Sequence, residues 1–135
     1  MDYIRNCIES GDSDSELIQD METFLIWPVS PSIMDIKEIQ TKVVNNVLEY
    51  GKKNNIKIDE DFALLKLYEE VGEFAQAILI HRKKCRKEKY VSEEVSKKEL
   101  AKELADVMGM VMVNAHLLKI DLADSIDKKW INKEK

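Results

Sequence analysis

Hydrophobic residues recur along this chain at the three- and four-residue spacing of α-helices, and no alternating strand pattern extends beyond a few residues. The clearest stretch is residues 64–80, LLKLYEEVGEFAQAILI. Its apolar positions form one helical stripe: Leu64, Leu67, Tyr68, Val71, Ala75, Ile78 and Leu79. Because only four glycines and two prolines interrupt 135 residues, the sequence predicts an all-α fold, a helical bundle.

A helix over residues 32–50 precedes this stretch, and Gly51 is its expected C-terminal stop. A polar link follows, after which either Asp59 or Asp61 is suited to cap the helix that contains residues 64–80. The sequence therefore predicts two helices joined by a short connection.

Further along, the SKKE sequence at residues 96–99 predicts a capping box that starts another long helix. We expect its buried stripe to consist of Leu100, Leu104, Val107, Met108, Val111, Ala115 and Leu118. Asp121 should open a last helix, in which we expect Trp130 to be buried in the bundle.

Residues 1–31 form a separate N-terminal helical extension in this reading, and residues 32–135 form the main domain. The extension places Leu17, Ile18, Met21, Phe24 and Leu25 on one helical face. Two interpretations stay open: the extension covers part of the core or the seam between two copies, or it is a docking arm for a partner protein.

Acidic residues interrupt the apolar pattern at one-turn spacing on two of the predicted helices. Glu70 and Glu73 project from one helix face about 5 to 6 Å apart, where like charges repel. Lys66 is the only cation within residues 64–80. Glu103 and Asp106 repeat this spacing on the later helix. If the two pairs converge, they need a cation, and carboxylate oxygens suit Mg²⁺ or Mn²⁺.

Charge and composition narrow the classes of function. Charged residues make up 35% of the chain, and the net charge of −5 argues against binding to a nucleic-acid polymer. Two cysteines without a CxxC partner indicate reduced thiols, and no apolar run is long enough to span a bilayer. We therefore expect a cytoplasmic protein with no membrane partner.

A basic block, HRKKCRKEK, occupies residues 81–89 between the two acid-bearing helices. Lysine and arginine are favourable at a helix C-terminus, so the plain interpretation is a solvated helix end. The alternative is that one or two of these cations reach a polyphosphate.

The segments LYEEVGEFAQAIL and KELADVMGMV, followed by KIDLADSIDKKW, resemble the MazG-like all-α nucleoside triphosphate pyrophosphohydrolases. The signature of that family is an ExxE on one helix and an ExxD on another. The resemblance runs roughly from residue 36 to the C-terminus, and residues 1–31 have no counterpart in it.

The resemblance implies a fold, a reaction and a set of residues. The reaction is hydrolysis of a nucleoside triphosphate to the monophosphate and pyrophosphate. Glu70, Glu73, Glu103 and Asp106 are the implied ligands of Mg²⁺, with Mn²⁺ as a substitute. Glu70 and the preceding Glu69 are the expected catalytic carboxylates, and Glu69 would position the water.

The sequence indicates the substrate-binding residues less clearly than the metal ligands. Relatives have a Lys and then an Asn near the C-terminus; Lys129 fits the first, and Asn132 falls one residue early for the second. Asn114 and Gln40 are further candidates, although an inter-helix hydrogen bond is the plainer role for Asn114. Met110 stands where many relatives have an aromatic residue that can stack on a base.

Several functions fit this pattern. The first is removal of non-standard or surplus nucleoside triphosphates by a homodimer or homotetramer. Alternatives within the enzymes are a dUTP- or dCTP-specific pyrophosphatase and a phosphoribosyl-ATP pyrophosphohydrolase. From another class, the chain could be a nucleotide-sensing helical binding module without catalysis. A di-iron carboxylate bundle is disfavoured because the chain lacks ExxH motifs.

Overall fold

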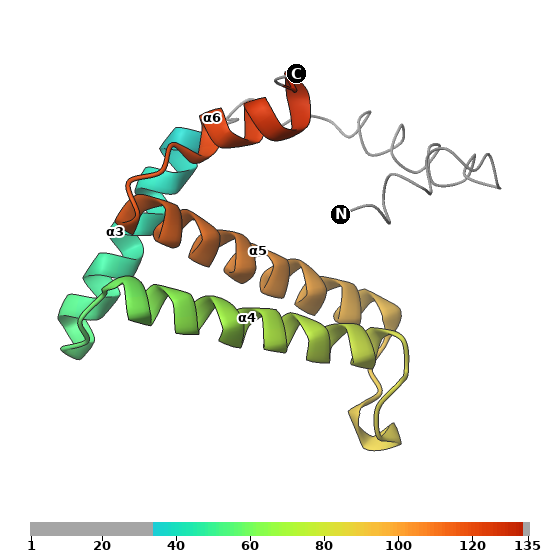
Figure 1. Ribbon diagram of the computed structural model, residues 1–135. Helices are drawn as coiled ribbons and strands as arrows, with labels where there is room; N and C mark the ends of the chain where they lie inside the picture. Colours follow the sequence, from blue (N-terminus) through green and yellow to red (C-terminus); the bar gives the residue numbers. More distant parts are fainter. Residues whose placement is uncertain (1–33, 134–135) are drawn as a thin grey trace. The chain divides into compact units, whose positions relative to one another are not determined.

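The computed structural model describes residues 34–133, which form helices and no strand (Figure 1). The long helices are α3 (Ile36–Asn54), α4 (Glu60–His81) and α5 (Glu93–Leu117). The short ones are the 3-10 turn η1 (Lys87–Lys89), α6 (Leu122–Ile126) and the π-helical turn η2 (Asp127–Ile131). The predicted all-α fold is confirmed. The predicted extension over residues 1–31, and its boundary with the main domain, lie outside the described residues.

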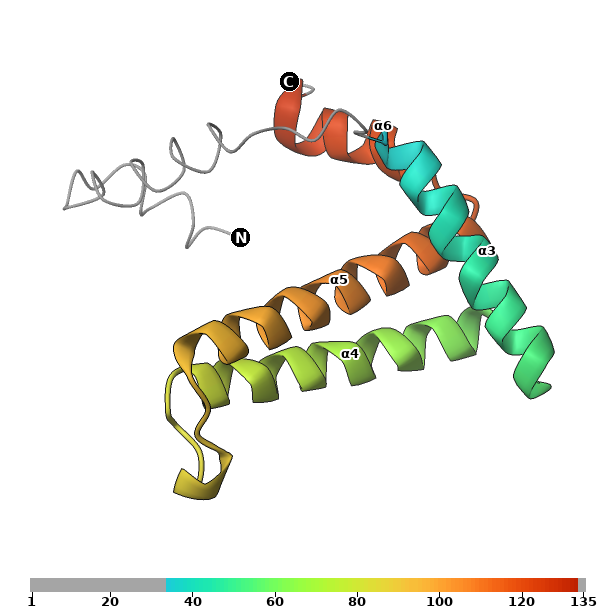
Figure 2. The ribbon, with the colours of Figure 1, turned by 180° about the vertical axis from the view of Figure 1, so that it is seen from behind.

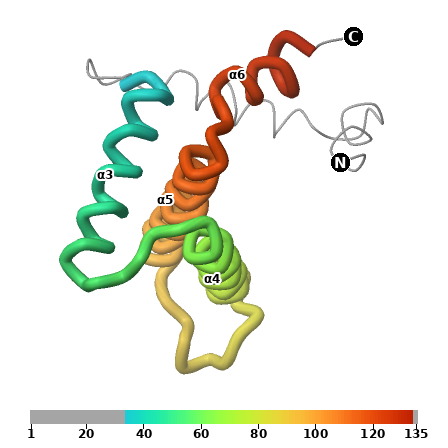
Figure 3. The backbone as a smooth tube through the Cα atoms, turned by 60° about the vertical axis from the view of Figure 1, so that its left-hand side comes forward, coloured from blue at the N-terminus to red at the C-terminus, as the bar shows by residue number. Residues whose placement is uncertain are grey.

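Helices α4 and α5 run antiparallel and side by side, joined by the loop that carries η1 (Figure 1, Figure 2). Helix α3 packs against α5 at the end of this hairpin where α4 begins and α5 ends (Figure 3). The core lies there and is formed by Val44 of α3, Ala63 of α4, and Met110 and Val113 of α5. This packing holds the two acid-bearing helices in a defined register.

Aspartate side chains begin three of the helices, because each accepts a hydrogen bond from an amide that the helix leaves free. Asp35 caps α3 through the amide of Glu38 at 2.8 Å. Of the two candidates for α4, Asp59 is the cap, and it binds the Phe62 amide at 3.0 Å. Asp121 caps α6, as predicted.

Gly51 is not the stop that the sequence predicts. Helix α3 continues to Asn54, and Asn55 ends it in the left-handed conformation, with φ of 55°. Gly51 is buried within the helix, where a Cβ atom would lie 2.5 Å from Ile58 Cγ1 and 2.8 Å from the Ile56 carbonyl oxygen. The glycine therefore lets the chain fold back closely against α3.

The capping box predicted at Ser96 is wrong by one turn. Helix α5 begins at Glu93, and Ser92 caps it by accepting from the Val95 amide at 3.2 Å. Ser96 is buried, donates to the Glu93 carbonyl at 2.8 Å and lies 2.8 Å from Nδ1 of His81. This contact ties the first turn of α5 to the last residue of α4.

Several side chains predicted to be core are exposed in the single chain. On α4, Tyr68 is 69% exposed, and on α5, Leu104 is 52% exposed. The same holds for Leu64, Val71, Leu79, Met108 and Leu118. The prediction that Trp130 is buried is also wrong, because its side chain on η2 is 59% exposed. Within residues 34–133, four helices and two short turns do not cover both sides of the hairpin.

Within residues 34–133, none of the helices combines the length and apolar character that crossing a bilayer requires.

Candidate active site

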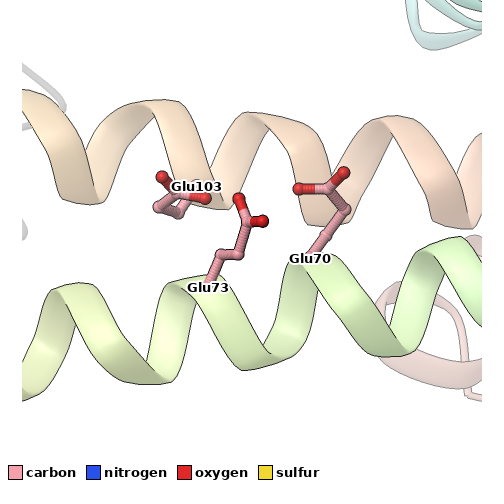
Figure 4. A group of neighbouring side chains, drawn as sticks. All are labelled: Glu70, Glu73 and Glu103. Carbon is pink, nitrogen blue, oxygen red and sulfur yellow. The ribbon is translucent and has the colours of Figure 1, made fainter.

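Three glutamates meet between α4 and α5. Helical spacing places Glu70 and Glu73 one turn apart on α4, and Glu103 faces them from α5 (Figure 4). One carboxylate oxygen of each lies within 4.8 Å of one from each of the others. Oxygens so close can share one hard cation, so these residues could hold a metal ion.

The burial of these groups favours a cation. Glu70 is 8% exposed, and Glu103 is half-buried. The Oε2 atom of Glu103 is shielded from solvent and has no hydrogen-bond partner among the described residues. A carboxylate oxygen buried without a partner is costly, and a bound metal ion would satisfy it. The donor set therefore fits a divalent metal.

The electrostatics of Glu103 agree with this geometry. Burial, followed by the charge of Glu73, raises the pKa of the Glu103 carboxyl above its usual value. Smaller contributions in the same direction come from Asp106, Glu70 and Glu99. Negative charges from both helices therefore converge on Glu103, and a cation would relieve their repulsion.

Lys66 partly neutralises the acids on α4. Its ammonium lies 2.7 Å from Oε2 of Glu69 and 3.1 Å from Oε1 of Glu70. The hydrogen bond with Glu69, helped by the one with Glu70, raises the pKa of Lys66 although burial opposes the shift. Both spacings are helical, so sequence reasoning could have found this bridge from the positions of the residues alone.

The remaining two predicted acids lie at the margin of the three-glutamate cluster. Asp106 is exposed and is not one of the three residues whose oxygens meet, although its charge contributes to the raised pKa of Glu103. Glu69 is exposed and paired with Lys66. Metal binding by Asp106 and positioning of water by Glu69 stay predictions.

Two of the predicted substrate-binding residues make inter-helix hydrogen bonds. The side-chain amide of Asn114 donates to the carbonyls of Ala63 at 2.9 Å and Met110 at 2.8 Å, which joins α5 to α4. Gln40 donates to the Met112 carbonyl at 3.0 Å and joins α3 to α5. These contacts give both residues a structural role, and their contact with substrate stays a prediction.

Gln40 also lines a cavity of about 370 Å³ between α3 and the C-terminal end of α5, with Lys37 and His116 among its walls. This cavity does not include any of the three glutamates.

The C-terminal candidates lie on and after η2. Lys129 is exposed, and the side-chain amide of Asn132 donates to both carboxylate oxygens of Asp127, at 2.9 and 3.2 Å. No hydrogen bond or ion pair within residues 34–133 links either residue to the three glutamates. Their role as substrate contacts stays a prediction.

A second cavity adjoins the three-glutamate cluster, and the sequence did not reveal it. It has a volume of about 240 Å³ and lies between the loop ends of α4 and α5. We call it the loop recess. Its polar lining consists of Glu73, Gln76, Lys89, Ser96, Glu99 and Glu103, and its apolar lining of Ala77, Ile80, Val91 and Val95.

Fold and site together define an all-α domain in which two antiparallel helices present a candidate divalent-metal centre. Comparison with known families identifies it further: the model of the MazG nucleotide pyrophosphohydrolase domain matches residues 59–134, more than half of the chain. The chain therefore belongs to the MazG family of nucleotide pyrophosphohydrolases. Searches of curated proteins and of solved structures found no match.

Proposed function

We propose that this protein is a magnesium-dependent pyrophosphohydrolase that converts nucleoside triphosphates to monophosphates and pyrophosphate. The observation that carries the proposal is the meeting of Glu70, Glu73 and Glu103, with an unpartnered buried oxygen on Glu103. Family membership supports the same chemistry at the level of nucleotide pyrophosphohydrolysis. Mn²⁺, which also accepts carboxylate oxygens, should substitute for Mg²⁺.

The proposed reaction balances with one water molecule. The water oxygen forms a bond to the phosphorus nearest the nucleoside, the bond from that phosphorus to the bridging oxygen breaks, and pyrophosphate leaves. When bound, the metal neutralises charge on the phosphate oxygens. Glu70, Glu73 and Glu103 would hold the ion, with Asp106 as the proposed fourth ligand. Glu69 would orient the water, which gives up one proton to the surrounding solvent.

The biological task that fits this reaction is removal of non-standard or surplus nucleoside triphosphates in the cytoplasm. Enzymes specific for dUTP, dCTP or phosphoribosyl-ATP share the same metal chemistry and differ in how they recognise the nucleoside. A panel of common and damaged nucleoside triphosphates, with phosphoribosyl-ATP included, separates these possibilities by the rate of pyrophosphate release.

A non-catalytic nucleotide-binding module is the alternative from another class. Calorimetry with a non-hydrolysable nucleotide and Mg²⁺, run beside the turnover assay, distinguishes the two. Binding without release of pyrophosphate from any member of the panel would identify a sensor and contradict the proposed activity.

Glu70→Gln provides the mutational test. This change keeps the size of the side chain but removes a charge from the cluster, so pyrophosphate release should fall by at least about a hundredfold. The matched control is Glu49→Gln, because Glu49 is an exposed glutamate on α3. The assay uses the substrate of the panel that the wild-type protein hydrolyses fastest. Equal rates of pyrophosphate release by Glu70→Gln and the wild-type protein would overturn the proposed site.

Exposed apolar side chains on both helices of the hairpin support association with a second copy. Tyr68 and Leu79 lie two and nine positions from Glu70, so at about 100° per residue they face the opposite side of α4. Met108 is likewise turned by about 140° from Glu103 on α5. We therefore propose a homodimer or homotetramer that covers these side chains and leaves the glutamates accessible.

A further inference from the structure

The loop recess connects the three-glutamate cluster to the loop between α4 and α5. Glu73 and Glu103 belong to the cluster and also line the recess, whose lining extends to Lys89 on η1. A polyphosphate held by a metal ion on Glu73 and Glu103 would therefore have open space beside it in the direction of Lys89.

Lys89 lines the loop recess and differs in its pairing from the lysines at the start of α5. Lys97, Lys98 and Lys102 each pair with a glutamate one turn earlier on α5, at 2.9, 2.7 and 2.6 Å. Lys89 makes no ion pair or side-chain hydrogen bond within the described part of the chain, although three glutamates line the same recess. Its ammonium group is therefore available to an anionic ligand.

The loop holds the backbone of Lys89 in place. The amide of Lys89 donates to the Arg86 carbonyl at 2.9 Å, which closes the η1 turn. The hydroxyl of the next residue, Tyr90, donates to the Lys83 carbonyl at 3.1 Å and ties the turn to the end of α4. These bonds fix the backbone from which the Lys89 side chain extends, so less of the loop has to be ordered when the ammonium group binds a ligand.

We infer that the loop recess receives the pyrophosphate end of the substrate and that Lys89 is the cation that binds it. The inference rests on the proposed function. Without metal, Glu73 and Glu103 repel phosphate; with a divalent ion on them, the ion and Lys89 attract it. Because Lys102 already pairs with Glu99, that carboxylate adds less repulsion. Pyrophosphate should therefore bind only after the metal.

Calorimetry with inorganic pyrophosphate tests this inference on the full chain, with and without Mg²⁺. In Mg²⁺, Lys89→Met should weaken pyrophosphate binding about tenfold, since a charge-assisted hydrogen bond is lost. Lys89→Arg should restore most of the affinity, because it keeps a cation in place. The matched control is Lys87→Met: Lys87 belongs to the same η1 turn but does not line the recess, so its loss should change affinity less than about twofold.

Equal pyrophosphate affinity in Lys89→Met and the wild-type protein would overturn the inference, as would wild-type binding that does not need Mg²⁺. A change in KM that depends on the base, with pyrophosphate affinity unaltered, would also overturn it and assign the recess to the nucleoside. The measurement does not need turnover. A wild-type chain that binds pyrophosphate and Mg²⁺ but hydrolyses no nucleotide defeats only the proposed function.

Discussion

Lys66 occupies the position of a counterion beside Glu70, the most buried carboxylate of the site. Its side chain is 33% exposed and bridges Glu69 and Glu70, so it partly neutralises the acids in the absence of metal. A divalent ion at the same carboxylates would compete with this ammonium for Glu70. Metal binding at Glu70 would then exchange one cation for another.

This exchange predicts that Lys66→Met raises the affinity for Mn²⁺ several-fold, because a competing positive charge is removed. Lys98→Met is the matched control. Lys98 is also a paired lysine on an acid-bearing helix, but its partner is Glu94, which does not belong to the three-glutamate cluster or contribute to the raised pKa of Glu103. Calorimetric titration of Mn²⁺ into both variants measures the change in affinity. Unchanged or weaker Mn²⁺ binding in Lys66→Met would exclude competition.

The raised pKa of Glu103 predicts a pH-dependent stability of the metal-free protein. Because its pKa is higher in the folded chain than in the unfolded one, the folded state gains from protonation, and this gain is lost as pH rises through the raised pKa. Glu103→Gln should therefore increase the melting temperature at pH 7 in EDTA, and the increase should shrink toward pH 4. Thermal unfolding followed by circular dichroism checks this; an increase that is the same at both pH values contradicts it.

At the residue scale, spacing suggested that two acid pairs, Glu70 with Glu73 and Glu103 with Asp106, converge, and the structure brings the oxygens of Glu70, Glu73 and Glu103 together. The exposure of Asp106 depends on how α5 is rotated against α4, which spacing does not determine. The position of Lys89 beside the loop recess depends on the path of the loop between α4 and α5, which residue spacing does not determine either.

At the scale of the elements, the turn after α3 depends on a glycine within the helix. The fold-back places the Ile56 carbonyl and the Ile58 side chain against Gly51, whose own amide carbonyl accepts from the Ile56 amide at 2.8 Å. Sequence reasoning treated this glycine as a helix end, because glycine usually serves there. The other role of Gly51 comes from its close contact with Ile56 and Ile58, which follow it by five and seven positions.

Gly51→Ala should therefore destabilise the protein by about 1 to 3 kcal/mol, since the added Cβ meets backbone and side-chain atoms that cannot both move away. Gly109→Ala is the control, because its Cβ would meet only Val43 Cγ1 at 3.6 Å, an ordinary contact. At position 109, the better helix propensity of alanine should raise the free energy of unfolding by about 1 kcal/mol. Urea unfolding measures the free energy of unfolding of both variants. Changes of the same sign in the two variants would contradict the packing argument.

At the scale of the whole molecule, the described domain leaves apolar side chains exposed on both long helices of the hairpin. Tyr68 and Leu79 of α4 and Met108 of α5 are exposed and turned away from the glutamates of their own helices. Periodicity predicted that these residues belong to buried stripes, and their exposure in the described chain contradicts that prediction. It could not say whether the stripe packs inside one chain or against another, because both arrangements require the same pattern.

Association predicts that a charge among these exposed apolar side chains separates the copies. Tyr68→Lys should shift the protein toward monomer, because a buried unpaired ammonium is costly. Tyr50→Lys is the control: Tyr50 is also exposed, at 51%, but lies on α3. Light scattering after size-exclusion chromatography gives the mass of each variant. A wild-type mass equal to that of one chain would contradict the proposed oligomer.

The central claim, that Glu70, Glu73 and Glu103 bind one divalent ion, is tested most directly by calorimetric titration of Mn²⁺ into the wild-type protein, Glu103→Gln and Glu49→Gln. We predict that Glu103→Gln binds Mn²⁺ at least about tenfold more weakly, with unchanged helical content by circular dichroism, and that Glu49→Gln binds as the wild-type protein does. Equal affinity in all three proteins would contradict the account.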